Sequence, residues 1–130
     1  MADPKQDDGR GELPSDMIFV LADDDKICRI GYKGLLRQLC LNVNHTLSVI
    51  MGQTYNEANS VASTTYNLAE TYGHDKVILI SDQNLDSYEE GTVLGTNITK
   101  ETRALGFKGL VIISSSQDDE DSIYEYIRSG

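Results

Sequence analysis

The sequence predicts an α/β domain in which helices cover both faces of a parallel sheet. Short apolar runs of strand length occur four times along the chain, and segments with a helical spacing of apolar residues alternate with them. The runs are apolar throughout, as in strands that are buried on both faces. The 130 residues fit one domain with a modest core.

The first half of the predicted domain holds two strands and two helices. The run "MIFVLA" (Met17–Ala22) predicts the first strand, and "TLSVIM" (Thr46–Met51) predicts the second, which Gly52 closes. Apolar residues at helical spacing define one helix between the strands and another after them, which ends at Gly73. Those of the first are Cys28, Tyr32, Leu35, Leu36, Leu39 and Cys40, and those of the second are Ala58, Val61, Ala62, Thr65, Leu68, Ala69 and Tyr72.

The second half repeats the alternation. The runs "KVILIS" (Lys76–Ser81) and "GLVIIS" (Gly109–Ser114) predict the third and fourth strands. A third helix is expected over Tyr88–Leu105, although two glycines weaken its first half, and a fourth over residues 118–130. Residues 1–16 are polar and lack periodicity, which predicts a disordered leader, so the domain is expected to span residues 17–130.

Composition excludes several classes of function. The formal net charge of −10 argues against direct binding of nucleic acid, because phosphate backbones are recognised by patches of lysine and arginine. No apolar run approaches the roughly 20 residues of a membrane span, so this segment is expected to make no membrane contact. The first residues also lack the apolar core of a secretion signal, which predicts a cytoplasmic location.

Oxygen-bearing side chains follow three of the four predicted strands, in "LADDD", "LISDQN" and "IISSS". Because parallel strands end at one edge of their sheet, Asp23, Asp24, Asp82 and Ser114 are expected to converge there. Clustered carboxylates repel one another, so they are expected to have raised pKa values or to hold a hard cation such as Mg²⁺. A cation at this edge could also take phosphate oxygens.

Each of these motifs also has a simpler structural explanation. Asp23–Asp25 could be the acidic first turn of a helix, where negative charge complements the helix dipole. Asp82 could be a turn residue, and the serines after the fourth strand could cap a helix. The three motifs together favour a functional site over these separate explanations.

The set of motifs resembles the receiver domain of response regulators and hybrid histidine kinases. The resemblance rests on the acidic pair after the first strand, on "ISDQNLD" and on "VIISSS", and it runs from about Met17 to Gly130. Arg29 also lies where the family often has a basic residue. The resemblance implies a flavodoxin-like, doubly wound parallel sheet. It further implies a cytoplasmic signalling domain. In some members of the family, such a domain is part of a larger hybrid kinase that is attached to the membrane.

The resemblance also implies roles for individual residues. Asp82 would be the phosphoacceptor, which takes a phosphoryl group from a histidine kinase or a histidine phosphotransfer protein. Asp24 would bind Mg²⁺ directly, Asp23 largely through water, and Asn84 through its backbone carbonyl. Ser114 would be the switch hydroxyl that responds to the phosphoryl group. Such a domain is not an enzyme in the usual sense, although self-dephosphorylation is expected.

One departure from the family pattern leaves alternatives open. The family has a fifth strand with a lysine that pairs with the phosphoryl group, and this sequence ends at Gly130 without either, so the fifth βα unit is expected to be absent. The sequence could be cut before that unit, or it could be a shortened receiver. Gly109–Ser114 would then be an exposed sheet edge, which favours a homodimer. A degenerate receiver that serves as an interaction module is therefore an alternative. A small Mg²⁺-dependent phosphatase is another, although Asn84 stands where its general acid is needed.

Overall fold

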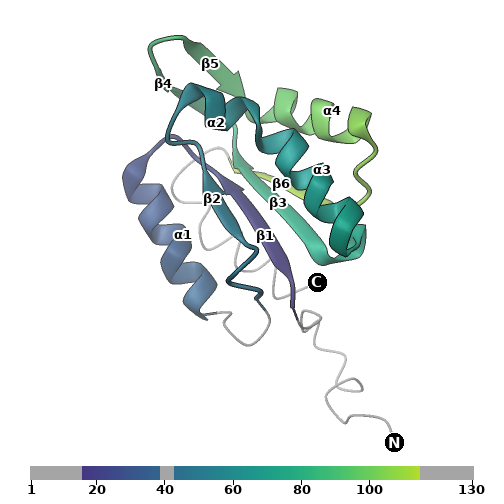
Figure 1. Cartoon of the computed structure of the whole chain (residues 1–130). Helices are drawn as coiled ribbons and strands as arrows, with labels where there is room; N and C mark the ends of the chain where they lie inside the picture. The colour runs from purple at the N-terminus through teal and green to yellow at the C-terminus, as the bar shows by residue number, and fades with distance from the viewer. Residues whose placement is uncertain (1–15, 39–42, 115–130) are drawn as a thin grey trace, which may run out of the picture.

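The computed structural model describes residues 16–38 and 43–114, and its centre is a parallel sheet of four strands. The strand order is β2-β1-β3-β6, the order of the first four strands in a flavodoxin-like sheet (Figure 1). The strands are β1 (Ile18–Ala22), β2 (Val49–Met51), β3 (Val77–Asp82) and β6 (Leu110–Ser114). The predicted α/β class with a parallel sheet is thus confirmed, and the arrangement is compatible with a flavodoxin-like fold.

Helices lie on both faces of the sheet (Figure 1). The helix α1 (Lys26–Gln38) packs on one face, whereas α2 (Tyr55–Asn59), α3 (Val61–Tyr72) and α4 (Gly95–Leu105) pack on the other. This division follows from the strand order, because β2 lies on one side of β1 and β3 on the other. Right-handed connections that run to opposite sides of β1 place their helices on opposite faces of the sheet. A short 3₁₀ helix, η3 (His74–Lys76), leads into β3.

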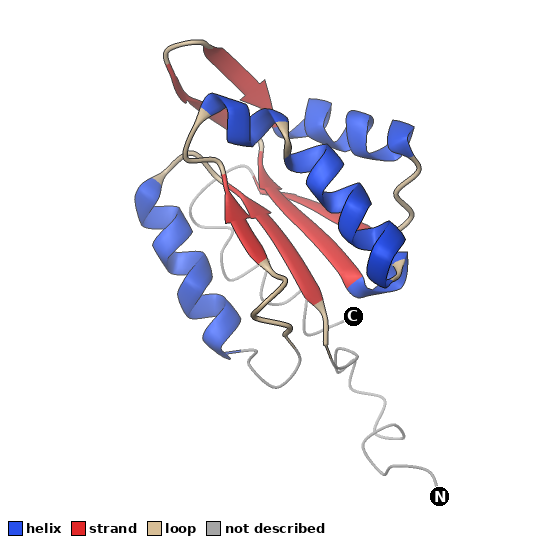
Figure 2. Cartoon of the chain, in the orientation of Figure 1, coloured by secondary structure: helices blue, strands red, loops and turns tan. Residues whose placement is uncertain are grey.

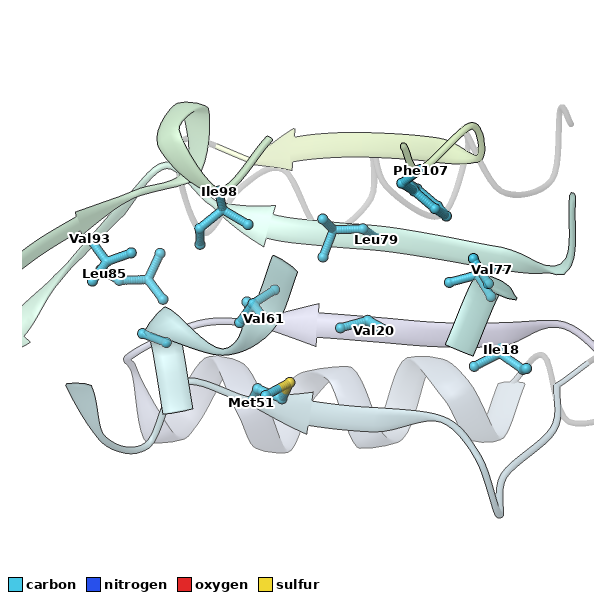
Figure 3. Packing of buried hydrophobic residues seen from close by; sticks show 13 residues of the cluster. Ile18, Val20, Met51, Val61, Val77, Leu79, Leu85, Val93, Ile98 and Phe107 are labelled. Atoms are coloured by element: carbon cyan, nitrogen blue, oxygen red, sulfur yellow. The ribbon is translucent and has the colours of Figure 1, made fainter. Parts of the chain in front are cut away.

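The two faces of the strands build two hydrophobic clusters. Phe19 and Leu21 of β1 contribute to the cluster beneath α1, whereas Ile18 and Val20 contribute to the opposite cluster, shown in Figure 3. Alternation along an extended strand sends successive side chains to opposite faces, and all of β1 is buried because both faces are covered. Each such side chain contributes about 1.5–3 kcal/mol to stability. The two clusters fix the strand ends firmly in place.

The prediction of a helix over Tyr88–Leu105 is wrong in its first half. The strands β4 (Asn84–Tyr88) and β5 (Gly91–Leu94) form an antiparallel hairpin, and α4 begins only at Gly95. The hairpin extends beyond the carboxyl ends of the parallel strands (Figure 2). Its Leu85 and Val93 are buried in the same cluster as α4, as Figure 3 shows, and this burial favours the hairpin over a longer helix.

Smaller differences concern the ends of other elements. The second strand is shorter than predicted, and the second predicted helix divides at Ser60 into α2 and α3. The predicted fourth helix (118–130) and all but the last residue of the predicted leader lie outside the described residues. In the described ranges, no helix is long and apolar enough to cross a membrane.

The loop between β2 and α2 is held by a capping arrangement. The hydroxyl of Thr54 accepts a hydrogen bond from the N–H of Glu57, and the Glu57 carboxylate accepts the N–H groups of Gly52 and Gln53. Gly52 has a φ of +114°, and a Cβ built on it would lie 2.3 Å from the carbonyl oxygen of Asp23. This position therefore requires glycine, and the close approach sets the backbone at the end of β1.

We expect Gly52→Ala to lower the free energy of unfolding by about 1–3 kcal/mol, because alanine is strained at this φ and its Cβ meets backbone rather than a movable side chain. Urea denaturation followed by circular dichroism measures the change. Gly34→Ala is the matched control, since it lies within α1 with nothing within 4 Å of its Cβ position. Alanine there should stabilise the protein by up to about 1 kcal/mol. Equal stability of the two variants would contradict the requirement for glycine at position 52.

Candidate functional site

The register of the sheet brings three carboxylates together. Ala22 of β1 pairs with Ser81 of β3, so Asp23, which follows Ala22, lies beside Asp82, the last residue of β3. One carboxylate oxygen from each of Asp23, Asp24 and Asp82 lies within 4.8 Å of the others. The convergence predicted for these three residues is confirmed. Between β1 and β3 the strand order changes side, because β2 lies on one side of β1 and β3 on the other, and ligands bind at such switch points in open α/β sheets.

Ser114 and Asn84 lie at the same edge of the sheet. Ser114 is the register partner of Asp82 in the neighbouring strand β6, and it is buried, with 5% of its surface exposed. The N–H of Gln83 donates to the carbonyl of Ser114 over 2.8 Å, which ties the end of β3 to that of β6. Asn84 begins β4 with an exposed side chain, and its N–H lies beside the carboxyl group of Asp82.

The carboxyl group of Asp23 is held on both of its oxygens. Oδ1 accepts the N–H of Asp25 over 2.9 Å, and Oδ2 accepts the Tyr32 hydroxyl over 3.4 Å. Burial raises the pKa of Asp23, and the neighbouring charges of Asp24 and Asp25 add to that effect, which the hydrogen bonds only partly oppose. Asp23 is thus a fixed, buried acid rather than a mobile surface group.

The pKa of Asp24 is shifted in the opposite direction, below its ordinary value. Its Oδ2 accepts three hydrogen bonds, from the N–H of Asp86 at 2.9 Å, the N–H of Ser87 at 2.8 Å and the hydroxyl of Ser87 at 2.7 Å. Partial burial alone would raise the pKa of Asp24, but these donors stabilise the anion and lower the pKa below its ordinary value. Asp24 therefore carries a full negative charge at neutral pH.

Asp82 is the least compensated of the three. Burial, followed by the charges of Asp23 and Asp24, raises the pKa of Asp82 to about 6, and the backbone N–H groups of Gln83 and Asn84 offset this only in part. A positive charge placed between the carboxylates would remove the repulsion. Carboxylate oxygens are ligands for hard cations, so these three residues could hold a metal ion.

Residues of α1 complete the surroundings. The guanidinium of Arg29 donates to the backbone carbonyl of Asp23 over 3.0 Å. Burial, and then the charge of Asp23, raises the pKa of the Cys28 thiol to about 12, and the same two causes raise the pKa of Tyr32. Cys28 therefore stays protonated at neutral pH, which makes it a poor nucleophile. The sequence predicted Cys28 and Tyr32 only as inward-facing helix residues.

Ser87 is the site residue that sequence reasoning missed. It contacts Asp24 across 63 positions of the chain, and such a contact leaves no local pattern. The available signal was the segment "SYEEGTVL", in which a glycine separates residues of high strand propensity, which is typical of a hairpin.

We expect Asp82→Asn to raise the free energy of unfolding at pH 7.5 by about 1 kcal/mol, because it removes a repelled, partly buried charge. The folded-state pKa of about 6 exceeds the ordinary 3.8, so the folded protein takes up a proton that the unfolded chain does not. Wild-type stability should therefore rise as pH falls through 6 toward 4, and the advantage of the variant should disappear.

Urea denaturation at several pH values checks this expectation without added metal ions. Glu101→Gln is the matched control, since Glu101 is an exposed carboxylate on α4. An Asp82→Asn variant that is less stable than wild type at pH 7.5 would contradict the stated electrostatics.

The chain was also compared with known proteins. No family model matches it, no curated protein matches it, and no solved structure matches it. The geometry of the site and the resemblance of its motifs therefore carry the functional argument.

Proposed function

We propose that this chain is a phosphoryl-accepting receiver domain of a two-component phosphorelay, in which Asp82 takes a phosphoryl group from a phosphohistidine. The partner would be a histidine kinase or a histidine phosphotransfer protein in the cytoplasm. The observation that carries the proposal is the position of Asp82 at the end of a buried parallel strand, with oxygens of Asp23 and Asp24 within 4.8 Å.

The residues at this edge fit Mg²⁺. Three carboxylates offer hard oxygen ligands within one small volume, and Mg²⁺ commonly uses one or two carboxylates while it keeps several waters. Asp24 and Asp82 would bind it directly, Asp23 through water and Asn84 through its carbonyl. When bound, the cation neutralises charge on the acidic cluster and on phosphoryl oxygens.

The raised pKa of Asp82 supports its proposed role as phosphoacceptor. Its pKa of about 6 leaves it mostly ionised at pH 7.5 yet more basic than an ordinary aspartate. In the transfer, an oxygen of Asp82 forms a bond to phosphorus while the phosphorus–nitrogen bond of the donor breaks. The electron pair of that bond stays on the imidazole nitrogen of the partner.

Ser114 would respond to the new group. It stands opposite Asp82 in the β3–β6 register, and an aspartyl phosphate adds negative charge and strong acceptor oxygens beside it. A hydrogen bond from its hydroxyl to the phosphoryl group would favour one arrangement of the end of β6. The phosphorylated and free forms would then differ in the surface that they offer to partners.

A protein partner is supported by the surface of α1, which begins three residues after Asp23. Ile27 and Ile30 of this helix are 75% and 57% exposed. Exposed apolar side chains beside a reaction centre are suited to a protein that must bring its own phosphohistidine to Asp82.

We expect phosphoramidate, a small donor with a phosphorus–nitrogen bond, to add one phosphoryl group to the wild-type chain in the presence of Mg²⁺. Intact-mass spectrometry detects the adduct, which EDTA should abolish, because the transfer depends on charge neutralisation at the acidic cluster. Asp82→Asn should give no adduct, whereas the control Glu101→Gln should react as wild type does. An adduct that persists in Asp82→Asn, or none in wild type, would contradict the proposal.

A second candidate is a degenerate receiver that acts as a dimerisation module without phosphorylation. The observation that favours it is β6, which among the described strands pairs only with β3 and carries Leu110 and Ile113 at 46% and 38% exposure. An apolar strand edge of this kind can pair with a second copy.

For this candidate, wild type should behave as a dimer in size-exclusion chromatography with light scattering, because the edges of two copies would pair. Ile113→Lys should behave as a monomer, since a charge on an edge strand opposes pairing. The control Thr92→Lys changes an exposed residue of β5 and should leave the dimer intact. A monomeric wild type that accepts a phosphoryl group would exclude this candidate.

A further inference from the structure

We propose that Ser87 is a positioning residue that fixes the carboxylate of Asp24 for cation binding and thereby makes the site selective for Mg²⁺ over Ca²⁺. The inference deepens the proposed function and rests on it, because it concerns the same cation site. It assigns a role to the β4–β5 hairpin, which neither the acidic motifs nor the sheet topology explains.

Three hydrogen-bond donors converge on one oxygen of Asp24. Two N–H groups and one hydroxyl, all from Asp86 and Ser87, lie 2.7–2.9 Å from Oδ2 of Asp24. A carboxylate oxygen has about two lone-pair sites, so Oδ2 is fully occupied. Cation binding therefore falls to Oδ1, and the carboxylate cannot turn to offer both oxygens without losing these bonds.

These donors come from a segment that is itself anchored by buried contacts. Leu85, two residues before Ser87, is fully buried, and it pairs with the buried Val93 of β5. Tyr88, the next residue, donates its hydroxyl to the carbonyl of Gly52 and packs edge-on against Tyr55. Ser87 thus lies between two residues that are held by tertiary contacts, Leu85 and Tyr88, so its hydrogen bonds can fix the position of the Asp24 carboxylate.

Selectivity follows from how many oxygens remain available. Both oxygens of Asp23 accept hydrogen bonds, from Asp25 and Tyr32, and one oxygen of Asp24 is occupied by the hairpin. Asp24 can therefore offer only one oxygen, and the hydrogen bonds to Asp23 hold its carboxylate in one orientation, which suits the six-coordinate Mg²⁺ with its retained waters. Ca²⁺ takes six to eight ligands and often binds carboxylates through both oxygens, which this arrangement opposes.

The test is a titration of ¹⁵N-labelled protein with Mg²⁺ and, separately, with Ca²⁺, followed by backbone amide shifts at constant pH. We expect Ser87→Ala to bind Mg²⁺ about tenfold more weakly than wild type, as is usual when a partner of a ligating carboxylate is removed. Its affinity for Ca²⁺ should change much less, because Asp24 then keeps only the two backbone N–H donors and turns more easily to offer both oxygens to the larger cation. Ser87→Thr keeps the hydroxyl and should restore the Mg²⁺ affinity.

Two further variants separate positioning from general structure. Ser63→Ala removes an exposed hydroxyl of α3 that donates to the carbonyl of Ser60, far from the acidic motifs in the sequence, and should bind both cations as wild type does. In an Asp24→Asn background, Ser87→Ala should cause no additional loss, because the group that it positions is already changed. Dispersed amide spectra show that each variant is folded.

Three results of these titrations would overturn the proposed role of Ser87. Unchanged Mg²⁺ affinity in a folded Ser87→Ala variant would overturn this inference and leave the proposed function standing. Equal loss of Mg²⁺ and Ca²⁺ affinity would likewise overturn it, because that result marks a merely structural role. Wild-type protein that binds neither cation would overturn the inference together with the cation site of the proposed function.

Discussion

The pairing register of β1 and β3 is the constraint on which the site depends. Because Ala22 pairs with Ser81, the next residues of the two strands, Asp23 and Asp82, must lie side by side. Both strands are buried on both faces, so neither can slip by one residue without moving apolar side chains off their clusters. The hydrophobic core thus holds together carboxylates that would separate if they were free to move.

The three carboxylates differ in their hydrogen-bond partners and in the shifts of their pKa values. The backbone of Asp25 and the hydroxyl of Tyr32 hold Asp23, and the hairpin supplies three donors to Asp24, but Asp82 keeps a pKa raised to about 6. Asp23 and Asp24 are therefore held in place by hydrogen bonds, whereas burial and the charges of these two neighbours raise the pKa of Asp82. This asymmetry agrees with the proposed division into cation ligands and phosphoacceptor, since an acceptor must remain nucleophilic while its neighbours stay in place.

Sequence reasoning reached the sheet and the acidic cluster because both are encoded in short apolar runs and in the residues that follow them. It failed at the hairpin, where the burial of Leu85 and Val93 depends on residues distant in the sequence. Ser87 was missed for the same reason, since its partner is 63 residues away. Gly52 was predicted to close the second strand, but only the structure reveals its close approach to Asp23. Local patterns thus predicted the elements, whereas tertiary contacts determine how the site is supported.

The most direct test of the central claim is a titration with beryllofluoride and Mg²⁺, which together mimic an aspartyl phosphate, followed by backbone amide spectra. The account predicts saturable shifts at Asp82, at Ser114 and at Ser87 of the hairpin, because these residues surround the acceptor. The shifts should vanish in Asp82→Asn. An unchanged wild-type spectrum at millimolar Mg²⁺ would contradict the claim that this cluster accepts a phosphoryl group.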